Sequence, residues 1–383
     1  MLAFFNVKLD INRFFIEDSE GQVAGQQNAG DVPKVETGGG VANGNDGGTD
    51  PFEDALDDAL CVYVTGDETQ DFIHKNEKLI MFYVDLENEE IVDKQADQQK
   101  MVDEGAAVDD EQAQQSKHPV LLNQYPLCFN HSLFMLFADA GLPQVLSDEL
   151  LLLMLQIFKV NDVESLRIGY DSMGADCITN NLHFHLIYAD QMFKDHAQVG
   201  RVGDSEAGFP IELASKKLFF RTTLQHKNKE EINMYNCPVR FGELGDDWPL
   251  KCLLLSPDIQ DEQQDTALED AQEALAHTAG IVLNYLIDQN IPHNILITDD
   301  GMTLYVIPRK FDLIIERVAF HTSFESLCGF VKFKNKQAYD QVQHEELFEQ
   351  LRSNVSLSNE DFARMKQELI EKFTKEYEGE IIG

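Results

Sequence analysis

The stretch GYDSMGADCITNNLHFHLIY, from Gly169 to Tyr188, indicates more about the fold and chemistry of this chain than any other. Its last part, Leu182 to Tyr188, is apolar or aromatic apart from His183 and His185, a pattern typical of a buried strand. Side chains two residues apart on a strand point to the same face, so the two imidazoles project together from positions about 7 Å apart. Before the strand, Gly169 to Thr179 is rich in small and hydroxyl residues, whose backbone N–H groups can approach an anion closely. This order of loop and strand favours phosphate chemistry.

Two other interpretations of the histidine pair stay open on the sequence. The chain has 11 histidines in 383 residues, which by chance give about 0.3 pairs of this spacing. Both rings can therefore be ordinary residues of a half-buried strand, hydrogen-bonded to backbone carbonyls. A metal site is the second alternative, because imidazole is a common zinc ligand, but no C-x-x-C or H-E-x-x-H pattern nearby supplies further ligands. We expect neither a metal nor a cofactor.

The composition predicts a globular protein outside the membrane. Hydrophobic residues make up 43% of the chain and include 25 phenylalanines, which supports a substantial core. The longest apolar runs, such as Leu150 to Leu155, are far shorter than the roughly 18 residues of a membrane span. The N-terminal Met1 to Asp10 resembles neither a signal peptide nor a mitochondrial presequence, and the six cysteines have no paired spacing. We therefore expect a cytoplasmic location and reduced thiols.

The net charge of −38 is concentrated near the N-terminus. Glu17 to Glu111 holds 26 acidic residues against 5 lysines, a net charge of −21. A field of this sign repels nucleic acid and anionic membranes, so we expect no binding to either. A nucleotide or phosphate would need a local positive pocket. The arginines that we consider for it are Arg167, Arg221, Arg240 and Arg309.

Two acidic insertions interrupt the N-terminal part of the chain. Glu17 to Asp58 is rich in Gly, Asp and Asn, and Asn88 to Gln115 is rich in Gln and acidic residues. Neither has enough apolar surface to build a core, so both are expected to be disordered loop extensions that can serve as contact surfaces for protein partners. Strands are predicted around them at Met1 to Phe15, Cys61 to Thr65 and Lys78 to Leu86.

From His118 onward the pattern predicts an α+β fold with mainly antiparallel strands. The predicted strands are two within Val120 to Phe137, then Ser165 to Asp171, Asn181 to Tyr188, Leu250 to Leu255, His293 to Thr298, Thr303 to Pro308, Phe311 to Val318 and Gly329 to Phe333. The predicted helices are Asp148 to Phe158 with Ser147 as N-cap, Asp261 to Asn290 with an apolar stripe of Leu268, Ala271, Leu275, Val282 and Leu286, and a last one from Ser358 and Asp361 to about Tyr377. We divide the chain into an N-terminal region at 1–117, a core with the histidine strand at 118–245 and a C-terminal α+β half of the same fold at 246–383.

Leu121 to Gln191 resembles the GDP-hexose phosphorylases, which comprise the GDP-L-galactose and GDP-D-glucose phosphorylases and form a branch of the histidine-triad superfamily. The similar segments are LNQYPLCFNHSLFML, GLPQ at Gly141 to Gln144, LRIGYDSMGA at Leu166 to Ala175, NNLHFHLIY, NCPVRFGEL and QNIPHNILITDDG at Gln289 to Gly301. Their order and spacing agree with the family from His118 to Phe373. The resemblance implies a HIT-like, GalT-like antiparallel sheet with flanking helices.

The resemblance also implies a double displacement with a GDP-sugar and inorganic phosphate as substrates. His183 matches the family's nucleophile, which would attack the α-phosphorus of a GDP-hexose, release hexose 1-phosphate and form a guanylyl-histidine. Phosphate would then take the guanylyl group and give GDP. His185 matches the third motif position, where it would donate a proton to the bridging oxygen. The residues expected to contact substrate are Asp171, Ser172, Gly174, Thr179 and Asn181.

The chain departs from the family pattern at several polar positions. Asn181 replaces the first motif histidine, Asp171 replaces an asparagine of the phosphate loop, and Ile178 replaces a threonine. Ser326 and Phe330 replace the glutamate and histidine of a Glu-x-x-Gly-His pattern. A carboxylate at Asp171 opposes an anion unless it is protonated or turned away. The alternatives are therefore an active phosphorylase or nucleotide-sugar hydrolase and a catalytically impaired member that acts as a nucleotide-binding or interaction subunit. A cation that converges on His183 would favour the first.

Overall fold

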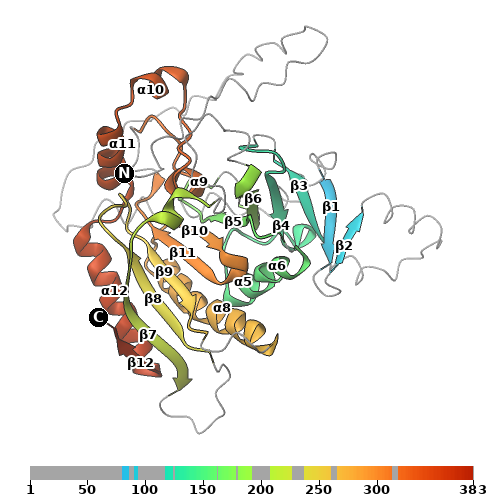
Figure 1. The fold of residues 1–383 in the computed structure, drawn as a ribbon, viewed down its shortest axis with the longest axis vertical. Helices are drawn as coiled ribbons and strands as arrows, with labels where there is room; N and C mark the ends of the chain where they lie inside the picture. The colour runs from blue at the N-terminus through green and yellow to red at the C-terminus, as the bar shows by residue number, and fades with distance from the viewer. Residues whose placement is uncertain are drawn as a thin grey trace, which may run out of the picture. The chain divides into compact units, whose positions relative to one another are not determined.

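The strands of this computed structural model form a single antiparallel sheet (Figure 1). The structure describes residues 80–85, 90–93, 117–123, 126–161, 163–177, 180–191, 208–226, 237–259, 265–312 and 318–382. In these ranges the sheet has 12 strands in the order β12-β7-β8-β9-β11-β10-β5-β6-β4-β3-β1-β2. The predicted α+β class, with an antiparallel sheet and flanking helices, is confirmed.

The strands and helices have the following bounds. The strands are β1 Ile80–Asp85, β2 Glu90–Asp93, β3 Lys117–Leu122, β4 Ser132–Met135, β5 Leu166–Asp171, β6 His183–Tyr188, β7 Lys216–His226, β8 Val239–Leu244, β9 Leu253–Pro257, β10 His293–Thr298, β11 Thr303–Pro308 and β12 Tyr377–Ile381. The helices are α5 Asp148–Leu155, α6 Ile157–Val160, α8 Asp265–Asp288, α9 Phe324–Leu327, α10 Lys336–Gln341, α11 His344–Gln350 and α12 Asn359–Glu376.

Four helices, α5, α6, α8 and α12, contribute to one hydrophobic core with the sheet. Leu166, Ile168 and Tyr170 alternate along β5 and are buried in this core. In Figure 1, α12 runs beside β12 and β7. The predicted apolar stripe of α8 is buried except at Leu268, which is 46% exposed. Leu268 lies in the first turn of the helix. The apolar period of the sequence includes this turn, but the packed part of the helix begins after it.

The opposite face of β5 carries Arg167, Gly169 and Asp171, and α9 lies against it. Both β5 and β10 contact α9. A Cβ atom added at Gly169 would come within 2.1 Å of the Phe324 ring, so glycine is required for this close approach. The histidines of β6 lie on the same side, since the ring centroids of His185 and Phe324 are 5.2 Å apart. This arrangement places α9 beside the histidine pair.

The caps and hairpins that short motifs predicted are present. The Ser147 side chain accepts a hydrogen bond from the Leu150 N–H at the start of α5, and the Ser358 side chain accepts one from the Asp361 N–H at the start of α12. The hairpin of β10 and β11 closes at residues 299–301, and the two strands pair from His293 with Pro308 to Thr298 with Thr303. In these elements the local sequence was sufficient.

Several predicted elements differ from the observed ones. Glu90–Asp93 pairs with β1 inside the second predicted insertion, because the alternating EIVD can add one short strand at the sheet edge. The strand predicted over Gly329 to Phe333 is reduced to an isolated bridge between Phe333 and Phe320. Of Phe311 to Val318, the described residues 311, 312 and 318 are not in a strand, because the chain leaves the sheet after β11. The predictions for Met1 to Phe15, Glu17 to Asp58 and Cys61 to Thr65 lie outside the described residues.

Long strands in the middle of the chain were not predicted at all. These strands are β7, Lys216–His226, and β8, Val239–Leu244. Their sequences do not alternate strictly between apolar and polar residues. The sheet continues from β8 to β9 across the predicted boundary at residue 245, so 118–245 and 246–383 share one sheet. The three-part division stays a prediction. Of the helices in the described ranges, none has the combination of length and hydrophobicity that a membrane span requires.

Candidate functional site

Gln144 holds the start of β6 at the end of β5. The β5–β6 ladder runs as far as Gly169 and His185, and the side chain of Gln144 bridges the two strands beyond this point. Its Nε2 donates to the carbonyls of Asp171 (3.0 Å) and His183 (3.1 Å), and its Oε1 accepts from the His183 N–H at 2.9 Å. The backbone of His183 is therefore fixed at the mouth of the loop that joins the two strands.

The ring of His183 has the protonation state of a nucleophile. Its Nδ1 lies 2.6 Å from the carbonyl oxygen of Asn181, which can only accept, so Nδ1 carries the proton and Nε2 carries the lone pair. Burial lowers the pKa of His183, although the bond to Asn181 opposes this effect. The ring is thus neutral near pH 7, and its Nε2 is available for attack.

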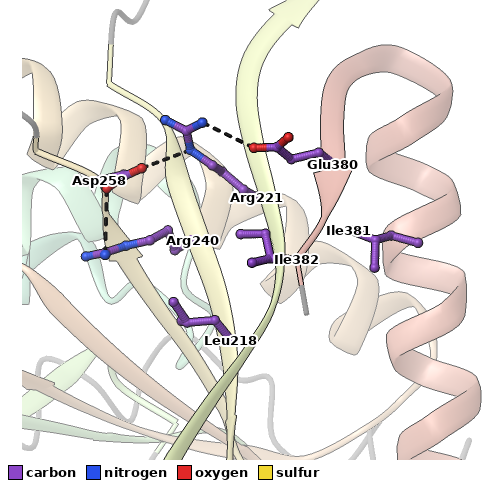
Figure 2. A pocket seen from close by; sticks show the side chains of 7 residues that line it. All are labelled: Leu218, Arg221, Arg240, Asp258, Glu380, Ile381 and Ile382. Carbon is purple, nitrogen blue, oxygen red and sulfur yellow. Dashed lines mark hydrogen bonds and ion pairs between the residues drawn. The ribbon is translucent and has the colours of Figure 1, made fainter.

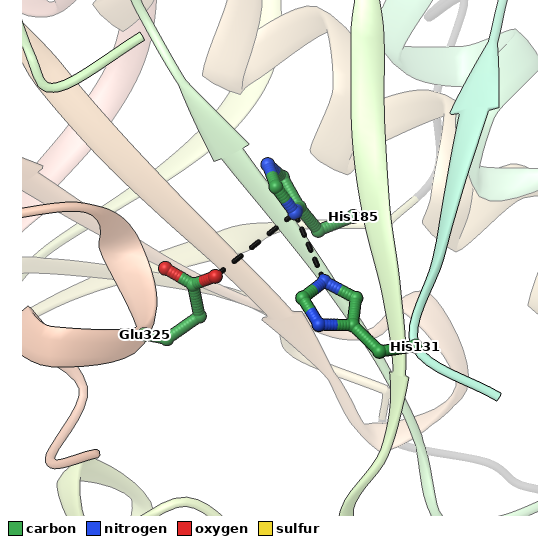
Figure 3. A group of neighbouring side chains, drawn as sticks. All are labelled: His131, His185 and Glu325. Atoms are coloured by element: carbon green, nitrogen blue, oxygen red, sulfur yellow. Dashed lines mark hydrogen bonds and ion pairs between the residues drawn. The ribbon is translucent and has the colours of Figure 1, made fainter. Parts of the chain in front are cut away.

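His131, the residue before β4, orients His185 (Figure 3). The Leu127 N–H donates to Nδ1 of His131 at 3.1 Å, so the proton of the neutral ring is on Nε2. The side-chain amide of Asn123, which lies 3.1 Å from this Nε2, must then turn its oxygen rather than its nitrogen toward the ring. That Nε2 lies 3.0 Å from Nδ1 of His185, which accepts the proton's hydrogen bond. Burial lowers the pKa of His131 to about 4 and that of His185 well below its usual value. His185 therefore carries its hydrogen on Nε2, 3.9 Å from Oδ2 of Asp171.

Glu325 on α9 brings a carboxylate to the same histidines. Its Oε1 lies 4.0 Å from Nδ1 of His185 (Figure 3). The same oxygen lies 3.3 Å from Nζ of Lys332. Burial alone would raise the pKa of Glu325, but the Lys332 ammonium, the same two histidines and the hydroxyl of Ser323 together outweigh it and lower the pKa below its usual range. The family has a glutamate at the position of Ser326. In this chain the preceding residue, Glu325, supplies a carboxylate.

His131, His185 and Glu325 are the group of described residues whose geometry suits a metal ion. One donor atom from each lies within 4.8 Å of the others. Metal-bound histidines donate their second N–H to an acceptor. Nδ1 of His131 instead accepts the N–H of Leu127, which leaves the proton on the Nε2 atom that would bind the metal. The donor chemistry fits a hydrogen-bonded chain better than a metal site.

Asp171 is turned toward the protein rather than toward a ligand. Its Oδ1 accepts from Nδ2 of Asn294 at 2.5 Å and from the N–H of Phe324 at 2.8 Å, and the side chain is buried. Burial and the neighbouring Glu325 raise the pKa of Asp171 well above its usual value. The side chain of Asp171 is therefore turned away from an incoming anion, and its charged form is disfavoured. Its hydrogen bonds tie β5 to β10 and α9.

The loop after β5 is held by the rest of the protein. Gly174 has a φ of 77°, and a Cβ there would lie 2.4 Å from the Phe311 ring, so glycine is required. The His293 N–H donates to Oγ of Ser172 at 2.8 Å. Asp176 accepts the N–H of Thr322 at 2.7 Å, which connects the loop to the segment before α9. Thr179 and Ile178 lie outside the described residues, and Phe330 is packed against Phe209 with ring centroids 5.0 Å apart.

None of the four arginines considered from the sequence reaches His183 as a free cation in the described structure. Arg309 is buried, pairs with Asp312 and donates to the Thr322 carbonyl at 2.6 Å. Arg167 pairs with Glu212 at 2.9 Å. Figure 2 shows Arg221 and Arg240 on either side of Asp258, in a hollow of about 540 Å³ on β7 and β8. Four strands separate β8 from β6 in the sheet.

Four residues of the site were not identified from the sequence. His131 and Gln144 lie inside segments that resemble the family, so the resemblance could have pointed to both. Glu325 is one residue before a substituted family position. Lys332 had no sequence signal, because its place depends on how the chain folds back beside α9.

Acidification should destabilise the fold through its buried neutral histidines. The folded-state pKa values of His131 and His293 are lowered from 6.5 to about 4. The unfolded state therefore binds more protons between these values, and the stability is present above pH 6.5 and lost as the pH falls toward 4. Each histidine contributes on the order of 3 kcal/mol. Urea unfolding at pH 7 and pH 4.5 should show a smaller loss for His131→Gln than for the wild type. Equal losses would contradict a buried neutral His131.

Asp171 can be tested with two substitutions that differ in hydrogen bonding. Asp171→Ala leaves the N–H of Phe324 unpaired and removes one of the two hydrogen bonds donated by Nδ2 of Asn294, which keeps its bond to the Ala175 carbonyl. The free energy of unfolding should therefore fall by about 2–4 kcal/mol. Asp171→Asn keeps an acceptor oxygen, and burial with the neighbouring Glu325 already raises the pKa of Asp171 and disfavours its charged form, so the loss should stay near about 1 kcal/mol. Chemical unfolding of both variants is the measurement. A loss for Asp171→Asn as large as that for Asp171→Ala would show that the carboxylate charge is needed.

Comparisons with known proteins find matches over most of the chain. Family models described as "GDPGP1-like, N-terminal domain" and "GDPGP1-like, C-terminal domain" match residues 68–187 and 223–376. The chain is 23% identical over 271 residues to GDP-D-glucose phosphorylase 1 of Xenopus laevis, which covers 67% of this chain and 57% of that protein. It is 26% identical over 259 residues to GDP-L-galactose phosphorylase 2 of Arabidopsis thaliana, which covers 65% of this chain and 50% of that protein. The chain thus matches only about half the length of these relatives.

A solved structure with detectable similarity is the yeast Ap4A phosphorylase Apa2 in complex with AMP. It is 14% identical, with a TM-score of 0.40, and the match covers 63% of this chain and 73% of that one.

Proposed function

The chain belongs to the family of GDPGP1-like proteins, and on this basis we propose that it transfers a guanylyl group from a GDP-hexose to inorganic phosphate through His183. The observation that carries the proposal is the hydrogen bond from Nδ1 of His183 to the Asn181 carbonyl. It leaves a neutral ring with its lone pair on Nε2, which is the form that attacks phosphorus. The named activities of the Xenopus and Arabidopsis relatives support the substrate class.

The first half-reaction would form a covalent intermediate. Nε2 of His183 attacks the α-phosphorus, and the bond between this phosphorus and the bridging oxygen breaks. The bridging oxygen leaves with its electron pair as part of hexose 1-phosphate. His185, with a hydrogen on Nε2, would donate a hydrogen bond to that oxygen as negative charge develops. The His131 ring would hold His185 in this orientation.

The second half-reaction would regenerate the enzyme. An oxygen of inorganic phosphate attacks the same phosphorus, and the bond between phosphorus and Nε2 of His183 breaks. The electron pair returns to Nε2, and GDP is the product. A neutral imidazole is a good leaving group near pH 7, which makes histidine suitable for both steps.

The proposal is tested by incubating the full chain with nucleotide sugars and phosphate. We expect GDP and a hexose 1-phosphate from a GDP-hexose, and much slower turnover of the corresponding UDP- and ADP-sugars. Formation of GMP and hexose 1-phosphate without consumption of phosphate would indicate a nucleotide-sugar hydrolase instead, because water would then take the guanylyl group from His183.

A non-catalytic nucleotide-binding subunit is the second candidate. It is favoured by Asn181 at a position where the family has histidine and by the acidic Asp176 in the loop after β5. This candidate predicts that GDP-hexoses bind in calorimetry while no product forms under any of these conditions.

A further inference from the structure

A short basic ribbon lies beside the histidine cluster. Residues 318–322 and 331–334 run antiparallel, with the His321 N–H donating to the Lys332 carbonyl at 2.8 Å and the Lys334 N–H donating to the Ala319 carbonyl at 2.9 Å. Phe320 and Phe333 form a bridge and are both buried. Because side chains alternate between faces, His321, Lys332 and Lys334 lie on the opposite face. His321 and Lys334 are exposed there, and Lys332 is half-buried.

Two contacts fix this ribbon next to the candidate site. The oxygen Oε1 of Glu325 lies 3.3 Å from Nζ of Lys332 and 4.0 Å from Nδ1 of His185. The N–H of Thr322 donates at 2.7 Å to Asp176, which belongs to the loop after β5. Burial lowers the pKa of His321, and the charges of Asp176, Lys332, Lys334 and Glu325 also act on its ring.

The site needs a cation that its other residues do not provide. The chain carries a net charge of −38, so a phosphate dianion is repelled unless a local positive charge opposes this field. His183 and His185 are neutral, and Arg309 is buried against Asp312. Lys332 is 30% exposed and can share its ammonium between Glu325 and a ligand. No carboxylate of the described residues forms an ion pair with Lys334, whereas Lys336, two residues later, pairs with Asp340 at 2.7 Å.

We propose that His321, Lys332 and Lys334 form the subsite for the phosphate that attacks the intermediate on His183. This inference rests on the proposed function and adds an acceptor subsite to it. In a double displacement the acceptor enters where the leaving group departed, on the side of the α-phosphorus opposite Nε2 of His183. The same subsite therefore holds the phosphate of the departing hexose 1-phosphate. The lysines supply charge without changing protonation, and no other reactant is required.

Variants of the full-length chain test the subsite in phosphorolysis with saturating GDP-hexose. Lys334→Met should raise KM for phosphate about 10-fold with little change in kcat, because the bound anion loses the attraction of one positive charge. The substitution breaks no ion pair within the described fold. Lys332→Met leaves Glu325 buried and unpaired, so we combine it with Glu325→Gln and expect an increase of at least the same size. Lys332→Arg should retain most of the phosphate affinity. The control is Lys336→Met, for which KM should not change.

The result that would overturn the subsite is an unchanged KM for phosphate in Lys334→Met and in the double variant. If the wild type shows no phosphorolysis at all, the proposed function fails, and calorimetry with inorganic phosphate at constant ionic strength decides the subsite separately. Binding that weakens in Lys334→Met and not in Lys336→Met supports it. Equal binding in all variants, or none in the wild type, rejects it.

Discussion

Replacing His183 by alanine is expected to lower phosphorolysis by at least about 10⁴-fold, because the variant has no group that can accept the guanylyl moiety. The free energy of unfolding should fall by only about 1–2 kcal/mol, since the ring is neutral and its single described hydrogen bond goes to the Asn181 carbonyl. His185→Ala should lose less activity, about 10² to 10⁴-fold, as expected for a hydrogen-bond donor to the leaving group. Steady-state kinetics and urea unfolding on the same preparations are the measurements.

The control for this series is His277→Ala. His277 lies on α8, on the core side of the sheet, and contacts Asp148 at 3.3 Å, so its loss should leave turnover unchanged. Turnover by His183→Ala within 10-fold of the wild type (roughly the effect of a positioning group rather than a nucleophile) would contradict the covalent mechanism.

Replacing Gly169 by alanine is expected to displace α9 and disable the site. The new Cβ would lie 2.1 Å from the Phe324 ring, and Phe324 adjoins Glu325 in the same helix. Overpacking of this kind costs about 1–3 kcal/mol. A shift of about 1 Å in a positioning residue lowers turnover roughly 10²-fold. The expected result is therefore a large fall in kcat together with a moderate fall in unfolding free energy.

Two variants show whether the effect comes from this contact. Gly242→Ala, in β8, meets its nearest neighbours at 3.3 Å and should cost much less activity. Adding Phe324→Leu to Gly169→Ala removes part of the clashing ring and should restore part of the stability. Equal losses of activity in the two glycine variants would mean that the glycine–Phe324 contact does not position the site.

Local signals explain which parts of the fold could be predicted. The β10–β11 hairpin has a tight Asp-Gly turn between two apolar runs, and α12 begins with a serine N-cap, so both depend on neighbours in sequence. The burial of β6 is likewise indicated by the apolar and aromatic residues around its two histidines, and one face of β5 by the alternating Leu166, Ile168 and Tyr170. The long strand β7, KKLFFRTTLQH, mixes polar and apolar residues without a clear period, because it is covered differently along its length.

The candidate site depends on contacts that no local pattern contains. Gln144 bonds to a residue 39 positions away, His131 to one 54 away, and Asp171 to Phe324 over 153 positions. The family resemblance located His183 and His185, and the structure places their ring centroids 5.5 Å apart. The resemblance could not reveal that Asp171 accepts the hydrogen bond of the Phe324 N–H at the start of α9. The arginines considered from the sequence are paired elsewhere, because the register of β7 and β8 sets Arg221 opposite Arg240 beside Asp258.

The most direct test of the central claim is the intact mass of the protein after incubation with a GDP-hexose in the absence of phosphate. We expect one guanylyl group bound to the chain, acid-labile and mapped to His183, which disappears on addition of phosphate with the release of GDP. We expect no adduct on His183→Ala and a full adduct on His277→Ala. Turnover of GDP-hexose by the wild type with no adduct at any time, or an adduct that persists in His183→Ala, would contradict transfer through His183.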